Sequence, residues 1–252
     1  MARPNYSPET LAELDAAARR HFWFRHRNRL LAQVLRSRLR QIAEPKILEV
    51  GCGTGGVLRE IERALPAARL VGVDLFEEAI AYARRNTRAR LVAGDLATVE
   101  LGADMDAACA FDVIEHIDDD VATLRLLAAT LRPGGIVVVT VPAHDWLWTE
   151  LDDATFHRRR YSRQSLELAL QKAGLVPVFS SYLMSLALPP LWLRRVLLRG
   201  RRQPKRGWKD ELRVTPVLNG LMLAALAPER WLVEAGRRIP FGSSVLGIGA
   251  VN

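Results

Sequence analysis

Short apolar runs alternate with amphipathic segments through much of the chain. The amphipathic segments repeat apolar side chains at helical spacing and cover 8–40, 57–65, 77–85 and 121–131. The apolar runs have the length of buried strands and cover 46–50, 69–73, 91–93, 107–111 and 136–141. Short apolar runs bounded by turn residues are consistent with the strands of a parallel sheet. Because strands and helices alternate, the pattern predicts an α/β fold.

This alternation breaks down toward the carboxyl terminus. A helix from Arg163 to Ala173, with Gly174 after it, and a strand over 175–182 are still regular. The stretch that follows combines paired prolines, a basic run and an apolar segment over 217–235 that we predict to be one helix. A strand pattern returns over 244–251. A separate domain would need its own core, so we interpret the irregular stretch as an insertion before the last strand.

Together these elements predict a Rossmann-like, doubly wound, mostly parallel sheet of seven strands. The first helix has Ser7 as its expected N-cap and Pro8 at its first position. We expect a single domain over 1–252 in four parts. These are an N-terminal helical cap over 1–44, a ligand-binding core over 45–182, an apolar and basic, mostly helical insertion over 183–240, and the last strand over 241–252.

A glycine-rich turn directly follows the first predicted strand. The sequence E-V-G-C-G-T-G-G spans 49–56 and leads from that strand into a helix, with Gly51, Gly53 and Gly55 at alternate positions. Glycine has no Cβ, so the backbone can turn sharply there and approach a ligand closely. The turn therefore predicts a ligand site where the strand ends.

Two carboxylates follow the next two predicted strands. Asp74 ends V-G-V-D, about twenty residues after the glycine turn, where an acidic side chain can accept hydrogen bonds from ribose hydroxyls. Asp95 follows the third strand in A-G-D-L. The carboxyl ends of parallel strands share one edge of the sheet, so we expect both carboxylates and the glycine turn to line one crevice.

Over about residues 40–182 the chain resembles the class I S-adenosylmethionine-dependent methyltransferases. The resemblance rests on E-V-G-C-G-T-G-G, V-G-V-D, A-G-D-L, D-V-I-E-H-I and L-R-P-G-G. It implies S-adenosylmethionine as the cofactor and methyl transfer to a small molecule as the reaction. It also implies roles for individual residues in binding that cofactor.

By this resemblance the three glycines approach the methionine portion of the cofactor and Glu49 organises its polar end. Asp74 would hold the ribose. Asp95 would accept from the adenine amine and Leu96 would offer a backbone donor. The remaining two positions, Leu75 and Phe111, would pack on the adenine and lie beside the cofactor, respectively.

Two other readings of the same region remain open. A nicotinamide dinucleotide site uses a similar strand, turn and acidic residue. Gly56 supplies the third-glycine spacing of that fingerprint, but Glu49 and the A-G-D-L element then have no explanation. The other alternative is a protein that keeps the cofactor fold without catalysis and binds RNA or a membrane. The intact turn, Glu49 and Asp74 argue against it.

Three histidines are candidates for a general base, which methyl transfer needs only when the acceptor must lose a proton. His144 lies in a loop after the strand over 136–141, where it is expected to overhang the acceptor, and a neutral imidazole there can take a proton. His116 is an alternative base or part of the pocket framework. His157, with nearby Tyr161, is a base, a structural residue or an anion ligand.

Two further segments have alternative interpretations. The acidic run of Glu115 and 118–120 could hold a hard cation but more simply begins a helix, and we predict no metal site. The aromatic and basic segment 21–25 either covers the cofactor, with Arg25 or Arg29 meeting its carboxylate, or packs the N-terminal helix on the core.

Charge and composition narrow the partners. The net charge of +8 favours an anionic partner. Over 183–209 an apolar stretch is followed by a basic one, which predicts either peripheral membrane contact or a cover over the acceptor pocket. Nucleic acid is not favoured as a partner, because no RNA-binding motif accompanies the arginines. Cys52 and Cys109 give no reason to expect a disulfide.

The expected location is the cytoplasm, with contact to the membrane surface as the alternative. The N-terminus has no apolar segment behind a basic start and so predicts no secretory signal. The expected acceptor atom is an oxygen, ahead of nitrogen or carbon. We expect a small and lipophilic acceptor, such as a quinone precursor or a lipid-linked sugar.

Overall fold

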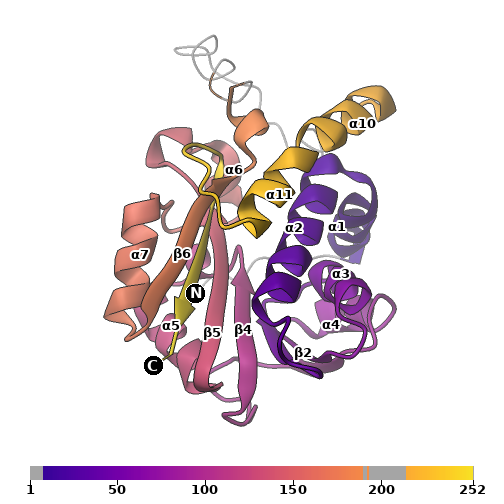
Figure 1. Cartoon of the computed structure of the whole chain (residues 1–252). Helices are drawn as coiled ribbons and strands as arrows, with labels where there is room; N and C mark the ends of the chain where they lie inside the picture. Colours follow the sequence, from indigo (N-terminus) through magenta and orange to yellow (C-terminus); the bar gives the residue numbers. More distant parts are fainter. Residues whose placement is uncertain (1–7, 190–191, 193–213, 252) are drawn as a thin grey trace.

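The computed structural model describes residues 8–189, 192 and 214–251, and it contains one seven-stranded sheet (Figure 1). The order across the sheet is β3-β2-β1-β4-β5-β7-β6. The strands are β1 (Lys46–Val50), β2 (Arg69–Asp74), β3 (Arg90–Ala93), β4 (Met105–Phe111), β5 (Leu131–Pro142), β6 (Val176–Leu183) and β7 (Ser244–Ala250).

Helices cover both faces of the sheet, as the alternating pattern predicts. The α-helices are α1 (Pro8–Arg20), α2 (Phe22–Arg38), α3 (Gly56–Ala64), α4 (Glu77–Ala83), α5 (Asp120–Ala129), α6 (Glu150–Ala154), α7 (Arg163–Lys172), α10 (Pro216–Ala225) and α11 (Ala227–Glu234). Short 3₁₀ turns are η1 (Ile114–His116), η2 (Asp145–Leu147) and η3 (Ser185–Ala187). The predicted Rossmann-like class is confirmed.

The last strand, β7, runs antiparallel to both of its neighbours, β5 and β6. Strands β1 to β5 are paired in parallel. A dinucleotide-binding fold usually has six strands in the order 3-2-1-4-5-6. The inserted antiparallel strand differs from that order, which argues against the nicotinamide alternative.

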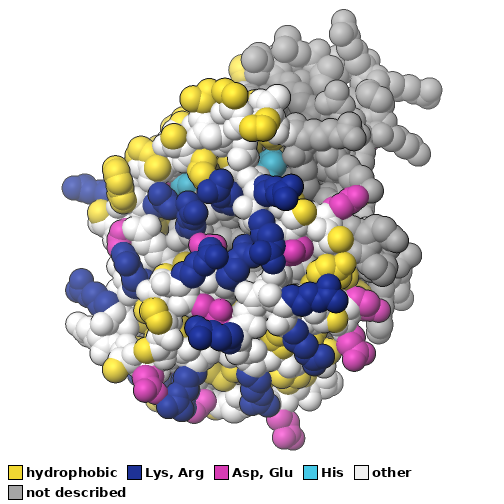
Figure 2. Space-filling view, turned by 90° about the vertical axis from the view of Figure 1, so that its right-hand side faces the viewer, with side chains coloured by type: hydrophobic (Ala, Val, Ile, Leu, Met, Phe, Trp, Pro, Cys, Tyr) yellow, Lys and Arg dark blue, Asp and Glu magenta, His cyan; other side chains and the backbone are white. Residues whose placement is uncertain are grey.

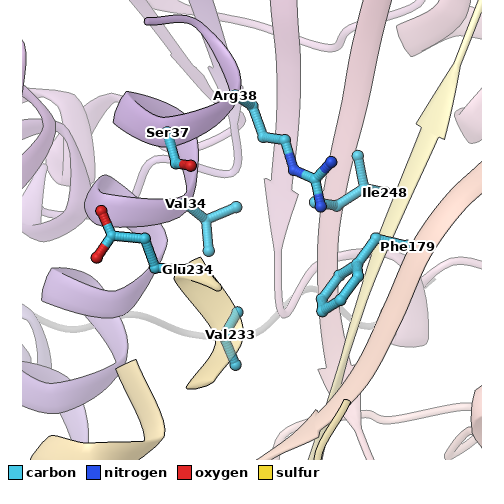
Figure 3. Close-up of a pocket in the computed structure, with 7 residues that line it drawn as sticks. All are labelled: Val34, Ser37, Arg38, Phe179, Val233, Glu234 and Ile248. Carbon is cyan, nitrogen blue, oxygen red and sulfur yellow. The ribbon is translucent and has the colours of Figure 1, made fainter. Parts of the chain in front are cut away.

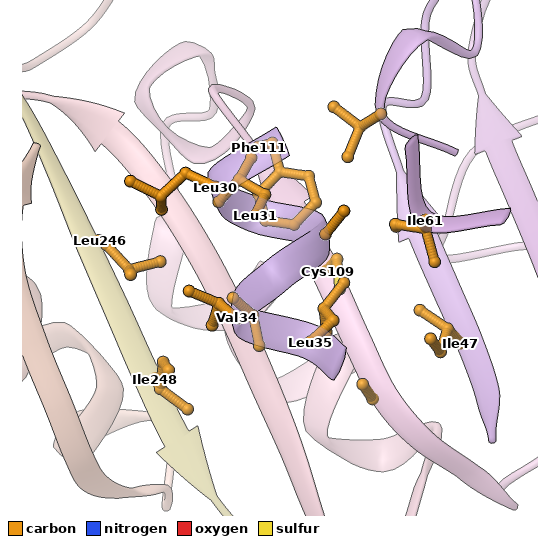
Figure 4. Close-up of a cluster of buried hydrophobic side chains, with 14 of the residues drawn as sticks. Leu30, Leu31, Val34, Leu35, Ile47, Ile61, Cys109, Phe111, Leu246 and Ile248 are labelled. Atoms are coloured by element: carbon orange, nitrogen blue, oxygen red, sulfur yellow. The ribbon is translucent and has the colours of Figure 1, made fainter. Parts of the chain in front are cut away.

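Helix α2 packs directly on one face of the sheet (Figure 4). Leu31 and Leu35 are fully buried on this helix, and Leu30 and Val34 lie on the same face. They pack with side chains from β1, β4 and β7, including Phe111. Apolar positions at i, i+1, i+4 and i+5 give a helix one continuous apolar stripe. The N-terminal segment is therefore part of the main core.

Two predicted boundaries were wrong. The apolar segment 217–235 forms two helices, because Pro228 lacks the amide hydrogen that would continue α10, and α11 begins with Pro in its first turn. The residues Pro133-Gly134-Gly135 separate the helix expected over 121–131 from the strand expected over 136–141 and were interpreted as a turn, but they lie inside β5, at an irregularity in its pairing with β4. Gly134 has φ 74°, which glycine adopts without strain.

The insertion between β6 and β7 is anchored on the N-terminal helices. His26 of α2 and Glu229 of α11 are both buried, with Nε2 and Oε2 2.7 Å apart. Glu229 also accepts from the amides of Met184 and Ser185, at 3.0 Å each. Burial pushes the pKa of Glu229 upward, but the hydrogen bond from His26 and the two amides outweigh it and hold the pKa below its usual value.

A second link joins α10 to the junction of α1 and α2. Asn219 Oδ1 accepts from the Phe22 amide at 2.6 Å, and its Nδ2 donates to the Arg20 carbonyl at 3.0 Å. The side chain thus satisfies backbone groups at the end of one helix and the start of the next. Within the described residues, the predicted insertion is helical, and its helices α10 and α11 pack against α2 of the cap.

Basic side chains spread over the face formed by the N-terminal helices, with acidic side chains among them (Figure 2). Several are paired, including Arg19 with Asp15 and Arg63 with Glu60. Among the described residues no helix is both long and apolar enough to cross a membrane. Most of the predicted membrane-contact segment, 183–209, lies outside the described residues, which include only 183–189 and 192 of it.

Candidate active site

The carboxyl ends of six strands meet at one edge of the sheet. Strands β1 to β4 are parallel to β5, and β5 and β6 both end opposite Ser244, the first residue of β7. The loops that follow these strands carry nearly all of the predicted site residues. The topology therefore brings them together, as expected for an open α/β sheet.

The glycine turn has a backbone conformation that other residues rarely adopt. Gly51, Gly53 and Gly55 have φ values of 70°, 52° and 77°. A Cβ at Gly51 would lie 2.4 Å from Val113 Cγ2, whereas one at Gly53 would meet no atom within 4 Å. Gly51 is therefore required by packing, while Gly53 faces open space in which a ligand can approach the backbone.

Asp74 is hydrogen-bonded to the glycine turn. Its Oδ2 accepts from the Gly53 amide at 2.8 Å and its Oδ1 from the Phe76 amide at 3.0 Å. Burial raises the pKa of Asp74, and these two amide bonds oppose the rise. Each carboxylate oxygen can accept a second hydrogen bond. Asp74 can thus hold the turn and still accept from a ligand hydroxyl.

Glu49 lies beneath the turn as a buried carboxylate. It is 2% exposed, and its Oε2 has no hydrogen-bond partner. Burial raises its pKa to about 8, and the charge of Arg27 opposes the rise. Arg27 reaches across from α2, and its Nη2 lies 2.9 Å from Asp112 Oδ2, just after β4. The guanidinium of Arg27 and the carboxyl groups of Glu49 and Asp112 therefore lie near one another at this edge of the sheet.

The remaining predicted cofactor residues differ in exposure. Leu75, immediately after Asp74, is 65% exposed. Asp95 is exposed, and its Oδ1 accepts from the Ala97 amide at 2.9 Å. Leu96 is half-buried and packs against a second cluster of buried apolar side chains, separate from the cluster that contains α2. Phe111 packs in the core with α2, which leaves little of its ring to face a cofactor.

Three of these features fit the cofactor that the sequence implies. The unpartnered Glu49 Oε2 can accept from a polar group, and the space at Gly53 admits a ligand beside the backbone. The exposed Leu75 offers an apolar surface to a flat ring. Residues of these kinds match the polar methionine end and the adenine of S-adenosylmethionine, and Asp74 can accept from its ribose.

His144 lies after β5 among aromatic side chains. Its ring stacks with Trp146, at 5.2 Å between centroids and 28° between planes, and with Tyr182, at 4.9 Å and 18°. Burial lowers the pKa of His144, and a backbone hydrogen bond with Gly242 opposes this only in part. The imidazole is therefore neutral at physiological pH.

His116 and His157 lie together, in a cluster separate from this stack. Their ring centroids are 4.7 Å apart. Burial, and after it the charge of the neighbouring His157, lower the pKa of His116 to about 4. The Arg158 amide donates to the Glu115 carbonyl at 2.7 Å, which fixes the loop carrying His157 against η1.

The acidic run does not act as a unit. Asp119 is the N-cap of α5 and accepts from the Ala122 amide at 2.8 Å. Asp120 accepts from the Tyr161 hydroxyl at 2.7 Å, and burial followed by this bond raises the pKa of Tyr161. Both residues have structural partners, as the helix-start interpretation expects. Glu115 differs because it is fully buried.

A small hollow elsewhere is unrelated to this edge (Figure 3). It lies between α2, α11 and strands β6 and β7, and Val34, Arg38 and Phe179 are among its lining residues. Arg38 stands over the Phe179 ring at 5.3 Å. Arg38 is eleven residues beyond Arg27 on the same helix, or about 16 Å along its axis. The hollow is therefore too far away to form part of the crevice.

In one of the two interpretations of segment 21–25, Arg25 or Arg29 meets the cofactor carboxylate, and Arg27 was not considered. Arg29 Nε lies 3.9 Å from Glu60 Oε2, whereas Arg27 pairs with Asp112 just after β4. The missing signal is helical spacing, because Arg27 precedes the buried Leu30 and Leu31 by three and four residues and so shares their face.

The strand order and the site together define an α/β protein that binds an adenosine-type cofactor at the carboxyl edge of its sheet. A sequence model of the "methyltransferase domain" family matches residues 17–178, more than half of the 252 residues. The chain therefore belongs to this family, and the resemblance inferred from the sequence is confirmed.

Individual relatives agree with the family. The chain is 31% identical over 168 residues to a probable S-adenosylmethionine-dependent methyltransferase of Mycolicibacterium smegmatis, covering 64% of this chain and 62% of that protein. It is 30% identical over 148 residues to a ubiquinone biosynthesis O-methyltransferase of Sodalis glossinidius, covering 53% and 58%. The matches thus span about three fifths of these relatives. The name of the first relative supports S-adenosylmethionine as the cofactor.

A solved structure shows the same fold. Phosphoethanolamine N-methyltransferase 2 of Haemonchus contortus, solved with S-adenosylmethionine, matches with a TM-score of 0.63 and 16% identity. The match covers 99% of this chain and 58% of that one. At this identity the likeness concerns the fold alone.

Proposed function

We propose that this chain transfers a methyl group from S-adenosylmethionine to an oxygen of a small, lipophilic acceptor. The observation that carries the proposal is His144, which lies after β5 at the same edge as the glycine turn and is neutral at physiological pH because burial lowers its pKa. A neutral imidazole can accept the proton that a hydroxyl acceptor loses. An acceptor without such a proton would need no base.

The cofactor residues have separate roles in this proposal. Glu49 and the turn of Gly51, Gly53 and Gly55 receive the methionine end, and Asp74 receives the ribose hydroxyls. Three residues form the adenine pocket and its walls: Leu75, Asp95 and Leu96. S-adenosylmethionine supplies an electrophilic methyl group on its sulfonium. The protein mainly positions the two reactants in line for displacement.

Exposed apolar side chains at the same edge of the sheet as His144 support a lipophilic acceptor. Trp146 after β5, Leu186 after β6 and Phe241 before β7 are 43%, 44% and 49% exposed. All three belong to segments at the edge where β5 and β6 end and β7 begins, and Trp146 stacks on His144. Exposed apolar groups near a polar group are typical of a ligand site. The name of the Sodalis glossinidius relative, an O-methyltransferase of ubiquinone biosynthesis, agrees with such an acceptor.

The test uses methyl-labelled S-adenosylmethionine and ortho-dihydroxybenzenes with alkyl tails of increasing length. We expect label in the phenols, with turnover that improves as the tail lengthens. Anilines with the same tails serve as matched acceptors that offer nitrogen instead. Label in the anilines alone, or no dependence on the tail, would contradict an oxygen or a lipophilic acceptor.

His144→Gln tests the base directly. The substitution keeps a polar side chain but removes the basic nitrogen, so we expect kcat to fall about 100-fold or more while cofactor affinity is unchanged. The wild-type rate should also persist at pH values below 6.5, the ordinary pKa of histidine, because the lowered pKa keeps His144 neutral there. A rate that halves at or above pH 6.5 would exclude His144 as the base.

A further inference from the structure

Glu115 is a buried carboxylate with no partner of its own. It is fully buried in η1, and neither Oε1 nor Oε2 has a hydrogen-bond partner. Arg27 and Arg160 act on it through their charge, but they pair with Asp112 and Asp152 instead. A buried carboxylate without hydrogen bonds is strongly unfavourable unless a proton or a cation accompanies it.

Two imidazoles face this carboxylate. His116 Nε2 lies 4.0 Å from Glu115 Oε1, and the His157 ring meets the His116 ring at 70°. One ligand atom from each of the three residues lies within 4.8 Å of the other two. The three side chains therefore converge on one small volume.

His157 is held in the orientation that a metal ligand needs. Its Nδ1 lies 2.7 Å from Asp152 Oδ1, and Asp152 is itself held by Arg160, with two nitrogens at 2.8 Å. The carboxylate accepts at Nδ1, so in the neutral imidazole Nδ1 carries the proton and the lone pair of Nε2 is available to a metal. A carboxylate behind a histidine in this way is the usual support of metal-ligating histidines. His116 is likewise fixed by backbone hydrogen bonds with Thr155 and Phe156.

We propose that Glu115, His116 and His157 together bind a divalent transition-metal cation. Two imidazole nitrogens and one carboxylate suit cations such as Zn²⁺, Co²⁺ or Fe²⁺, whereas Mg²⁺ and Ca²⁺ prefer oxygen ligands alone. The proposal extends the prediction from the sequence, which considered a cation only for the acidic run and preferred no metal. His157 was not part of that run, because 41 residues separate it from His116.

The position of the cluster gives the cation a role beside the reaction. Val113, two residues before Glu115, packs against Gly51 of the cofactor turn. Three protein ligands leave at least one coordination position open, as in catalytic zinc sites. A polar group of the acceptor can occupy that position. Metal binding itself does not depend on methyl transfer, so the two proposals can fail separately.

The first test is titration of full-length, untagged, chelator-treated protein with CoCl₂ and ZnCl₂, followed by calorimetry and by the visible absorption of Co²⁺. We expect one equivalent of each ion to bind, with a Co²⁺ spectrum typical of nitrogen ligation. MgCl₂ at the same concentration should not compete. Absence of stoichiometric binding, or displacement by MgCl₂, would overturn the proposal.

Variants locate the site. Glu115→Gln and His157→Gln should each weaken Co²⁺ binding at least 100-fold and alter its spectrum. Asp152→Asn leaves the three ligands in place but weakens the support of His157, along with the pairing of Asp152 with Arg160, and should weaken Co²⁺ binding about 10- to 100-fold. His21→Gln is the matched control, because it changes a half-buried histidine outside the cluster and should bind Co²⁺ like the wild type.

Thermal unfolding keeps the test decisive if a variant is unstable. In the wild type, one equivalent of ZnCl₂ should raise the Tm, because the cation binds the folded form. Glu115→Gln removes a buried charge, so without metal it should be at least as stable as the wild type, and ZnCl₂ should no longer raise its Tm. An undiminished rise in Glu115→Gln would place the cation elsewhere and overturn the proposal.

Discussion

The two halves of the carboxyl edge are built in different ways. The cofactor half comprises the turn 51–55, Asp74 and Asp95, and its parts follow β1, β2 and β3 in sequence. The acceptor half comprises the loops after β4, β5 and β6. In it, His144 stacks with Tyr182 from another strand, and His116 meets His157 from a distant loop.

The difference shows that a short sequence motif is enough to define the cofactor half, whereas the acceptor half is defined only by how distant segments pack. Gly53 and Asp74 are 21 residues apart and joined by a hydrogen bond that the parallel pairing of β1 with β2 makes possible. The acceptor half has no comparable local pattern, and its contacts depend on how long loops fold back. The cofactor half should therefore tolerate little change, while the acceptor half can differ between relatives on the same frame.

The largest expected effect is in the cofactor half. Asp74→Ala removes the carboxylate that holds Gly53 and that we assign to the ribose, so S-adenosylmethionine should bind about 100-fold more weakly, or about 3 kcal/mol for two hydrogen bonds to a charged group. Calorimetric titration measures this. Asp104→Ala, at the amino end of β4, is the control and should bind normally. Equal losses in both variants would show a general loss of folding.

The next effect concerns the contact between α11 of the insertion and α2, behind the acceptor half. Glu229→Gln should lower the free energy of unfolding by about 2 kcal/mol at pH 7, because a carboxylate that accepts from His26 and two amides is lost. The folded pKa of Glu229 is lowered, so its contribution is present above the ordinary value of 4.5 and is lost as the pH falls through the folded pKa.

Urea denaturation at pH 7 and below pH 4 checks this sign. The wild type and Glu229→Gln should differ at pH 7 and converge in acid. Glu44→Gln, which removes an exposed carboxylate, serves as the control and should differ little from the wild type at either pH. A difference that grows in acid would contradict the assigned direction of the pKa.

A smaller effect tests the residue that the sequence analysis missed. Arg27→Met removes the guanidinium between Glu49 and Asp112 and should weaken cofactor binding about tenfold, or about 1.4 kcal/mol. Arg29→Met, two positions along the same helix, is the matched control and should bind normally. If Arg29→Met were the variant with weaker binding, the original assignment would be correct and the present one wrong.

The smallest expected effect is at the junction of α1 and α2. Asn219→Ala removes the acceptor for the Phe22 amide and should destabilise the fold by about 1 kcal/mol, the usual cost of losing a helix cap. Asn219→Asp keeps that acceptor and should recover most of the loss. Thermal unfolding of the two variants distinguishes capping from a general intolerance of this position.

The sequence predicted the strands, the glycine turn and Asp74 because each depends on residues close together in the chain. The apolar pattern placed six of the seven described strands to within two residues at each end, and the exception is β5. It did not place Pro133-Gly134-Gly135, because strand pairing on both sides kept these residues within β5. For the break between α10 and α11 the signal was present in Pro228, but the apolar pattern on both sides outweighed it in our prediction.

That Glu115 and His157 lie close together could not be predicted in the same way. It depends on a backbone hydrogen bond between Arg158 and Glu115 and on the orientation that Asp152 gives to the ring. Neither has a local sequence pattern. Arg27, by contrast, is predictable from the sequence, because its helical spacing to Leu30 and Leu31 places it on the same face of the helix.

Two adjacent residues of α2 contact different parts of the protein. This limits which segments can be exchanged between relatives. His26 holds α11 of the insertion, and Arg27 reaches Asp112 at the cofactor. A chimera that imports residues 184–243 from a relative to change acceptor preference would leave His26 opposite a foreign residue. The grafted segment should therefore work only when the first forty or so residues are exchanged with it, so that the N-terminal helices and the insertion form one exchangeable unit.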